Sequence, residues 1–132
     1  MIKRQRLGRK EDEVAGYTIK HLDELEHPWP KWRLARKSLG LTSFGMNVTD
    51  LQPGEQIPEH DETERDHEEV FFVLRGSPSI VIDGQRHAAP EGTFVRLDPE
   101  PARTVVNDGT EPAQVLIISA PRQSGYEPLD WA

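Results

Sequence analysis

The sequence predicts an all-β fold, an antiparallel sandwich or barrel with little helix. Turn signals recur at short intervals along the chain, and short β-branched or aromatic stretches lie between them. The stretches expected as strands are residues 17–20, 41–48, 70–74, 79–83, 93–97, 103–106 and 114–118. A length of 132 residues suits one domain. So many short strands in one small domain are typical of a barrel or sandwich, in which sheet closure or pairing protects the strand edges.

Individual elements follow from local signals. Asp83 and Gly84 separate two short runs, and Asp-Gly at such a reversal favours a tight hairpin turn. The one expected helix is short and lies around residues 22–25, because Pro28 and Pro30 follow it closely.

Residues 115–118 read Val-Leu-Ile-Ile and are apolar on both faces of a strand. A strand of this kind is covered on both sides, so we expect the barrel interior on one face and a second copy of the chain on the other. The sequence therefore predicts a homodimer, with the tryptophan-rich segment around Trp29 and Trp32 at the same interface.

Composition and charge exclude several classes of protein. The chain has no cysteine, which removes thiol catalysis and iron–sulfur ligation. No apolar run approaches the roughly 18 residues of a membrane span, and we expect a cytoplasmic protein that does not bind membranes. Residues 1–15 carry a net charge of +2 and are expected to form a disordered basic tail, which leaves −9 for the predicted domain at 16–132. Such a negative domain argues against nucleic-acid binding.

The informative pattern begins at Gly54. His60 follows six residues later, and six residues separate Glu69 from Gly76. These spacings resemble the first motif of the cupin superfamily, which runs Gly, five residues, His-x-His, three or four residues, Glu, six residues, Gly. Glu62 stands where the motif has its second histidine, and the distance from Glu62 to Glu69 is two or three residues longer than in the motif. An insertion is therefore expected in this loop.

A second stretch resembles the second cupin motif, which runs Gly, five residues, Pro-x-Gly, a strand, His, three residues, Asn. Gly84, Pro90 and Gly92 match its start, and Asn107 matches its end. Arg103 occupies the histidine position. The resemblance implies a small single-domain cupin, with an antiparallel β-barrel of the jelly-roll or double-stranded β-helix type.

The resemblance also implies where a site would lie. The matching positions meet inside the barrel, so we expect a ligand-binding cavity formed by His60, Glu62, Glu69, Phe71 and Arg103. Phe71 shares the strand parity of Glu69. Arg103 cannot ligate a cation and would repel one, so no cofactor is expected. Its guanidinium is expected within hydrogen-bonding reach of Glu69, or presented to a small ligand, for which an anion is one option.

Three functions remain open at this point. The first is binding or sensing of a small molecule without catalysis. The second is a metal-dependent oxygenase or isomerase that holds Fe, Mn, Ni, Zn or Cu with a reduced ligand set. That set would be His60, Glu62, His67 and Glu69, with His67 returned to the cavity by the insertion. The third is a metal-free isomerase or epimerase with His60 as general base and Arg103 stabilising an enolate.

Overall fold

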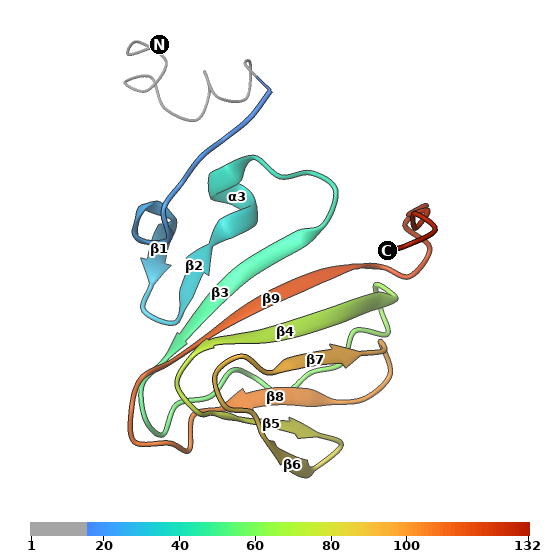
Figure 1. Ribbon diagram of the computed structural model, residues 1–132. Coiled ribbons are helices and arrows are strands. Elements are labelled where there is room, and N and C mark those ends of the chain that lie inside the picture. The colour runs from blue at the N-terminus through green and yellow to red at the C-terminus, as the bar shows by residue number, and fades with distance from the viewer. Residues whose placement is uncertain (1–15) are drawn as a thin grey trace.

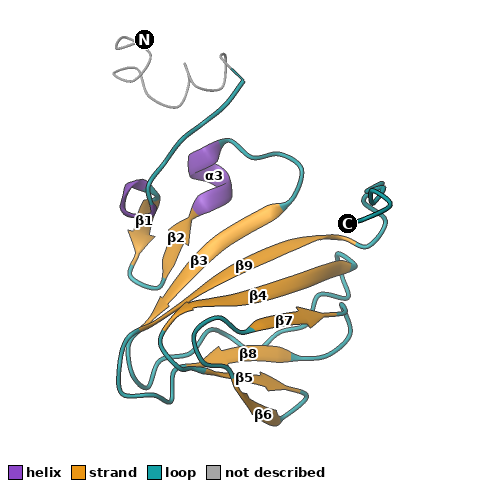
Figure 2. Ribbon diagram, viewed as in Figure 1, coloured by secondary structure: helices purple, strands orange, loops and turns teal. Residues whose placement is uncertain are grey.

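The computed structural model describes residues 16–132, and these residues form two antiparallel sheets (Figures 1 and 2). The strands are β1 (Glu26–Trp29), β2 (Trp32–Leu34), β3 (Gly45–Leu51), β4 (His67–Arg75), β5 (Ser79–Ile82), β6 (Gln85–Ala88), β7 (Phe94–Leu97), β8 (Arg103–Val106) and β9 (Ala113–Pro121). The larger sheet has the order β1-β2-β3-β9-β4-β7, and the smaller has β6-β5-β8. The helices are a 3-10 turn, η1 (Leu22–Glu24), and α3 (Ala35–Leu39). The all-β prediction with little helix is confirmed.

The hydrophobic core lies between the two sheets. Alternate residues of β4 face it, so β4 buries Phe71 and Val73 while the residues between them are half-exposed. The larger sheet also contributes Val115, and the smaller contributes Ile80 and Val105. Both sheets therefore share one core, and the site described below lies at the end of that core where β4 begins.

The predicted hairpin is present. β5 and β6 pair up to Ile82 and Gln85, which leaves Asp83 and Gly84 as a two-residue turn. Both turn residues have positive φ, 49° and 81°, as the tightest hairpin turns require.

The structure differs from the expected elements mainly near its beginning. Residues 17–20 are not a strand, and the strand expected from residue 41 begins at Gly45. The hairpin β1–β2 and the helix α3 were not expected. Pro28 is accommodated because β1 is an edge strand, where a missing N–H breaks no ladder. Gly40, in the left-handed conformation with φ 72°, ends α3.

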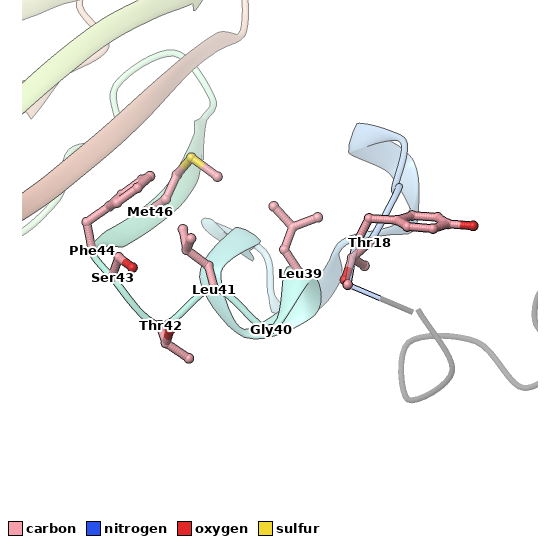
Figure 3. Close-up of a pocket in the computed structure, with 10 residues that line it drawn as sticks. Thr18, Leu39, Gly40, Leu41, Thr42, Ser43, Phe44 and Met46 are labelled. Carbon is pink, nitrogen blue, oxygen red and sulfur yellow. The ribbon is translucent and has the colours of Figure 1, made fainter. Parts of the chain in front are cut away.

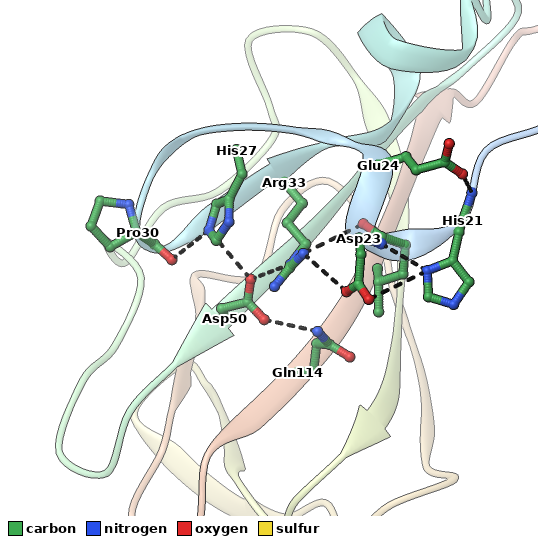
Figure 4. A network of polar contacts seen from close by, with 9 residues as sticks. His21, Asp23, Glu24, His27, Pro30, Arg33, Asp50 and Gln114 are labelled. Carbon is green, nitrogen blue, oxygen red and sulfur yellow. Dashed lines mark hydrogen bonds and ion pairs between the residues drawn. The ribbon is translucent and has the colours of Figure 1, made fainter.

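A network of polar contacts joins the β1–β2 hairpin to the neighbouring strands β3 and β9 of the larger sheet (Figure 4). Asp50 on β3 accepts hydrogen bonds from Arg33 Nε (2.7 Å) on β2 and from Gln114 Nε2 (2.9 Å) on β9. His27 Nε2 on β1 lies 3.6 Å from the same carboxylate. The hairpin is thereby held beside β3, which places Trp32 next to the pocket described below.

The strand expected to be covered on both faces is β9, which lies between β3 and β4. Val115 is fully buried in the core and Ile117 packs against it, as predicted for the inner face. Leu116 and Ile118 lie on the outer face and are half-buried. The homodimer through this face stays a prediction.

The disordered basic tail predicted for residues 1–15 lies outside the described residues. Within residues 16–132, no helix is both long enough and apolar enough to cross a membrane.

Candidate functional site

Backbone pairing brings the two cupin-like motifs together. His60 forms an isolated antiparallel bridge with Arg103, the first residue of β8. Each residue donates its N–H to the carbonyl of the other, at 3.0 and 2.8 Å. Glu69 lies near the start of β4, where its register partners are Leu97 on β7 and Ser119 on β9. Three positions distant in sequence thus meet at one end of the core.

His60, Glu62 and Glu69 form a compact cluster. One potential ligand atom of each lies within 4.8 Å of the others. Nε2 of His60 is 3.2 Å from Oε2 of Glu62 and 4.0 Å from Oε1 of Glu69. The other ring nitrogen, Nδ1, lies 3.0 Å from the carbonyl oxygen of Pro58. Because a carbonyl only accepts, Nδ1 donates there, and the Nε2 edge of the ring turns toward the two carboxylates.

Arg103 is fully buried behind this cluster. Its Nη1 lies 3.5 Å from Oε1 of Glu69, so the predicted ion pair is present. Nη2 donates to the carbonyl of Asp98. Its Nε has no hydrogen-bond partner among the described residues. The guanidinium does not line the pocket, so it stands behind Glu69 and is not presented to a ligand.

The surroundings of Glu69 raise the pKa of its carboxyl group. Burial raises its pKa above the ordinary value, and the nearby negative charge of Glu62 raises it further. The positive charge of Arg103, and that of His60 when protonated, act in the opposite direction. Its raised pKa together with its place in the pocket lining makes Glu69 a candidate for proton transfer to a bound molecule.

Three other expected site residues are placed differently. Glu62 contacts His60 but does not line the pocket. His67 Nδ1 lies 3.9 Å from Oε1 of Glu62, beside that residue and outside the three-membered cluster. Phe71 is fully buried in the hydrophobic core and does not line the pocket. Phe71 shares the inward face of β4 with Glu69, as predicted from its strand parity, but it lies deeper in the core than Glu69.

A pocket of about 350 Å³ opens beside the cluster. Its apolar walls come from Trp32, Met46, Ile57, Pro58 and Ile117. Its polar lining consists of Asn47, His60, Glu69 and Ser119. Ser119 is the register partner of both Glu69 and Gly45, so correct strand pairing would have found it from the sequence. Trp32 carried no comparable signal, because it belongs to the hairpin that was not expected.

A larger hollow of about 480 Å³ lies elsewhere, between the loop after α3 and the start of β3. The side chains of Leu39, Leu41 and Met46 line it (Figure 3). None of its described lining residues is acidic, basic or a histidine. The smaller pocket is therefore the candidate site, because it combines a cavity with titratable groups.

Comparison with known proteins agrees with this arrangement of motifs in the barrel. A family profile described as a cupin domain matches residues 47–119, which span both motif stretches and the strands between them. The chain belongs to the cupin family. A search of curated proteins finds no match for it.

Solved cupin structures share its fold at low sequence identity. A cupin protein from Bacteroides fragilis superposes with a TM-score of 0.71 at 22% identity, over 88% of this chain and 92% of the other. A sugar phosphate isomerase of the cupin superfamily from Silicibacter pomeroyi gives 0.65 at 20% identity, over 77% and 74%. A predicted oxalate decarboxylase from Thermotoga maritima gives 0.53 at 17%, over 57% and 64%. At these identities the likeness concerns the fold alone.

Proposed function

We propose that this cupin binds a small organic molecule in the pocket beside His60 and Glu69. The observation that carries the proposal is the lining: apolar walls with a few convergent polar groups at one end, in a volume suited to a small ligand. The names of two structural neighbours, a sugar phosphate isomerase and a predicted oxalate decarboxylase, denote small substrates. Both binding without catalysis and catalysis fit this proposal.

The charges around the pocket favour one kind of ligand group. Glu62 and Glu69 both turn oxygen atoms toward His60. Arg103 is engaged by Glu69 and Asp98, so an anion in the pocket would meet the carboxyl group of Glu69 rather than a guanidinium. We therefore propose a ligand that presents N–H, O–H or a positive group to this end. The same burial of Arg103 removes the support for a metal-free isomerase that uses it to stabilise an enolate.

Replacing Trp32 by alanine tests the pocket. A panel of small amines, polyols and carboxylic acids is first screened for compounds that raise the melting temperature of the native protein. We expect these compounds to have no such effect on Trp32→Ala, because that variant lacks one wall of the pocket. Trp29→Ala is the matched control, since Trp29 is the register partner of Trp32 on the same hairpin but is 59% exposed and away from the pocket. Equal shifts in both variants would contradict binding at this pocket.

A divalent cation held by His60, Glu62 and Glu69 is the second candidate. The specific observation is the orientation of the imidazole: Nδ1 is fixed by Pro58, as the second nitrogen of metal-binding histidines usually is, and the Nε2 edge faces two carboxylates. Acceptor atoms that converge in this way are stabilised when a proton or a metal ion lies between them. The donor set of one nitrogen and two carboxylates fits such an ion.

The charge of the cluster fits a cation as well. Relative to the cupin motifs, Glu62 adds one negative charge in place of a histidine and Arg103 adds one positive charge in place of another. His60, Glu62, ionised Glu69 and Arg103 together carry one negative charge, as do the three neutral histidines and one glutamate of the motifs. The repulsion of a cation by Arg103 is therefore offset by Glu62. Two carboxylates favour the harder ions Mn²⁺ and Fe²⁺ over Cu²⁺. Such an ion, held by His60, Glu62 and Glu69, would act as a Lewis acid toward a ligand oxygen.

Mn²⁺ titration by calorimetry tests the second candidate. We expect the native protein to bind Mn²⁺, and His60→Ala to bind it at least about tenfold more weakly, because the only nitrogen donor is lost. His87→Ala is the control, since His87 is exposed on β6. A native protein that shows no saturable binding, or equal affinity in His60→Ala, would overturn this candidate and leave the organic ligand alone.

A further inference from the structure

We propose that Arg122 is a positioning residue that holds Glu62 in the His60–Glu62–Glu69 cluster. The inference rests on the role proposed for that cluster. His60 is bridged to β8 and Glu69 lies in β4, so sheet hydrogen bonds fix both backbones. Glu62 differs, because it lies in the loop before β4 and in no strand. Its position therefore depends on other contacts.

Two backbone hydrogen bonds hold Glu62. Its N–H donates to the carbonyl of Pro99 (2.9 Å), and its carbonyl accepts from the N–H of His67 (3.2 Å). Pro99 lies in the connection between β7 and β8, and His67 is the first residue of β4. The place of Glu62 beside His60 thus depends on the spacing between these two segments.

Arg122 ties the two segments together from outside. It follows directly after β9, whose last residue pairs with His67, so β9 ends where β4 begins (Figure 1). Its N–H donates to the carbonyl of Asp66 (3.0 Å), and its Nε and Nη2 donate to Oδ1 of Asp66 (3.1 and 2.6 Å). Nη2 also donates to Oε2 of Glu100 (3.2 Å). Asp66 precedes His67 and Glu100 follows Pro99, so Arg122 joins the neighbours of both residues that hold Glu62.

Asp66 turns the chain into β4. Its φ of 55° lies in the left-handed region, which aspartate adopts more readily than most residues other than glycine. The side chains of Arg122 and Asp66 are 44% and 47% exposed. Exposed ion pairs add little to global stability, so the effect of Arg122 is expected on the position of the loop rather than on unfolding.

Amide hydrogen exchange without any metal or ligand tests the positioning directly. In Arg122→Ala we expect exchange at the amides of Glu62 and His67 to rise about tenfold, while the buried strand amides of β5 and β8 are unchanged. Arg86→Ala is the matched control: it also removes an exposed arginine ion pair, to Asp108 at 2.6 Å, but on β6. Unchanged exchange at both Glu62 and His67 in Arg122→Ala would overturn the proposal.

Mn²⁺ affinity then shows whether the position of Glu62 matters to the cluster. We expect Arg122→Ala to weaken binding about tenfold, Arg122→Lys to restore part of the loss, and Asp66→Asn to weaken it similarly while tolerating the left-handed backbone. In a Glu62→Gln background, Arg122→Ala should add almost no further loss, because the group it positions is already altered. The same tenfold loss in that background would overturn the proposal. If the native protein binds no Mn²⁺, the proposed cation site fails, and amide exchange alone decides on Arg122.

Discussion

Replacing Arg103 by alanine is expected to lower the free energy of unfolding by about 3–5 kcal/mol at neutral pH. The substitution leaves the carboxylate of Glu69, only 6% exposed, without its cation, and it removes a side chain that is fully buried. Chemical denaturation monitored by circular dichroism measures the change. Arg96→Ala, which removes exposed ion pairs to Glu68 and Asp98, is the control and should cost less than about 1 kcal/mol. A loss in Arg103→Ala no larger than in this control would contradict the buried pair.

The same variant should respond to pH in a defined direction. Because burial and Glu62 raise the pKa of Glu69, the folded protein keeps a proton that the unfolded chain releases. Stability therefore decreases as the pH rises from the ordinary glutamate range through the raised pKa of Glu69. Arg103 opposes this shift, and its removal raises the pKa of Glu69 further. The loss in Arg103→Ala should thus be largest above that pKa and smallest in acid, and Glu69→Gln in the same chain should remove the difference.

A chain that combines Glu62→His with Arg103→His is expected to bind Ni²⁺ or Zn²⁺ at least about tenfold more tightly than the native protein, about 1.4 kcal/mol in binding free energy. The two substitutions add imidazoles beside His60 and Glu69 and remove the buried positive charge. Calorimetric titration measures the affinity, and each single variant shows how much one imidazole contributes. Arg86→His is the control for an added surface imidazole. An affinity no better than that of the native protein would mean that position 103 does not match the motif histidine.

Much of the barrel could be predicted because its signals are local. The Asp83-Gly84 turn fixes a hairpin whatever surrounds it, since both residues tolerate positive φ. The pairing of Arg103 with Glu69 followed from motif positions, and it held because both positions lie where strand hydrogen bonds set the backbone. The positions of His60 and Glu69 beside each other followed for the same reason.

What could not be predicted depends on irregular or short elements. The strands β1 and β2 contain four and three residues, too few for a periodic pattern, so Trp32 could not be assigned to the pocket. The motif pattern placed Glu62 beside His60 but carried no information on what fixes an inserted loop, and that depends on Arg122, 60 residues further along the chain. The depth of Phe71 in the core depends on how the two sheets stack, which one strand cannot reveal.

The polar fastening of the β1–β2 hairpin has a consequence for how molecules reach the pocket. Trp32 forms one wall and lies in β2, which pairs with β3, while β1 beyond it is the edge strand and all four of its residues are exposed. An element held by hydrogen bonds at the surface opens at lower free energy than one held by buried apolar side chains. We therefore expect this edge of the larger sheet, β1 with β2, to open more readily than the central strands β3, β9 and β4, and to be where molecules enter and leave the pocket.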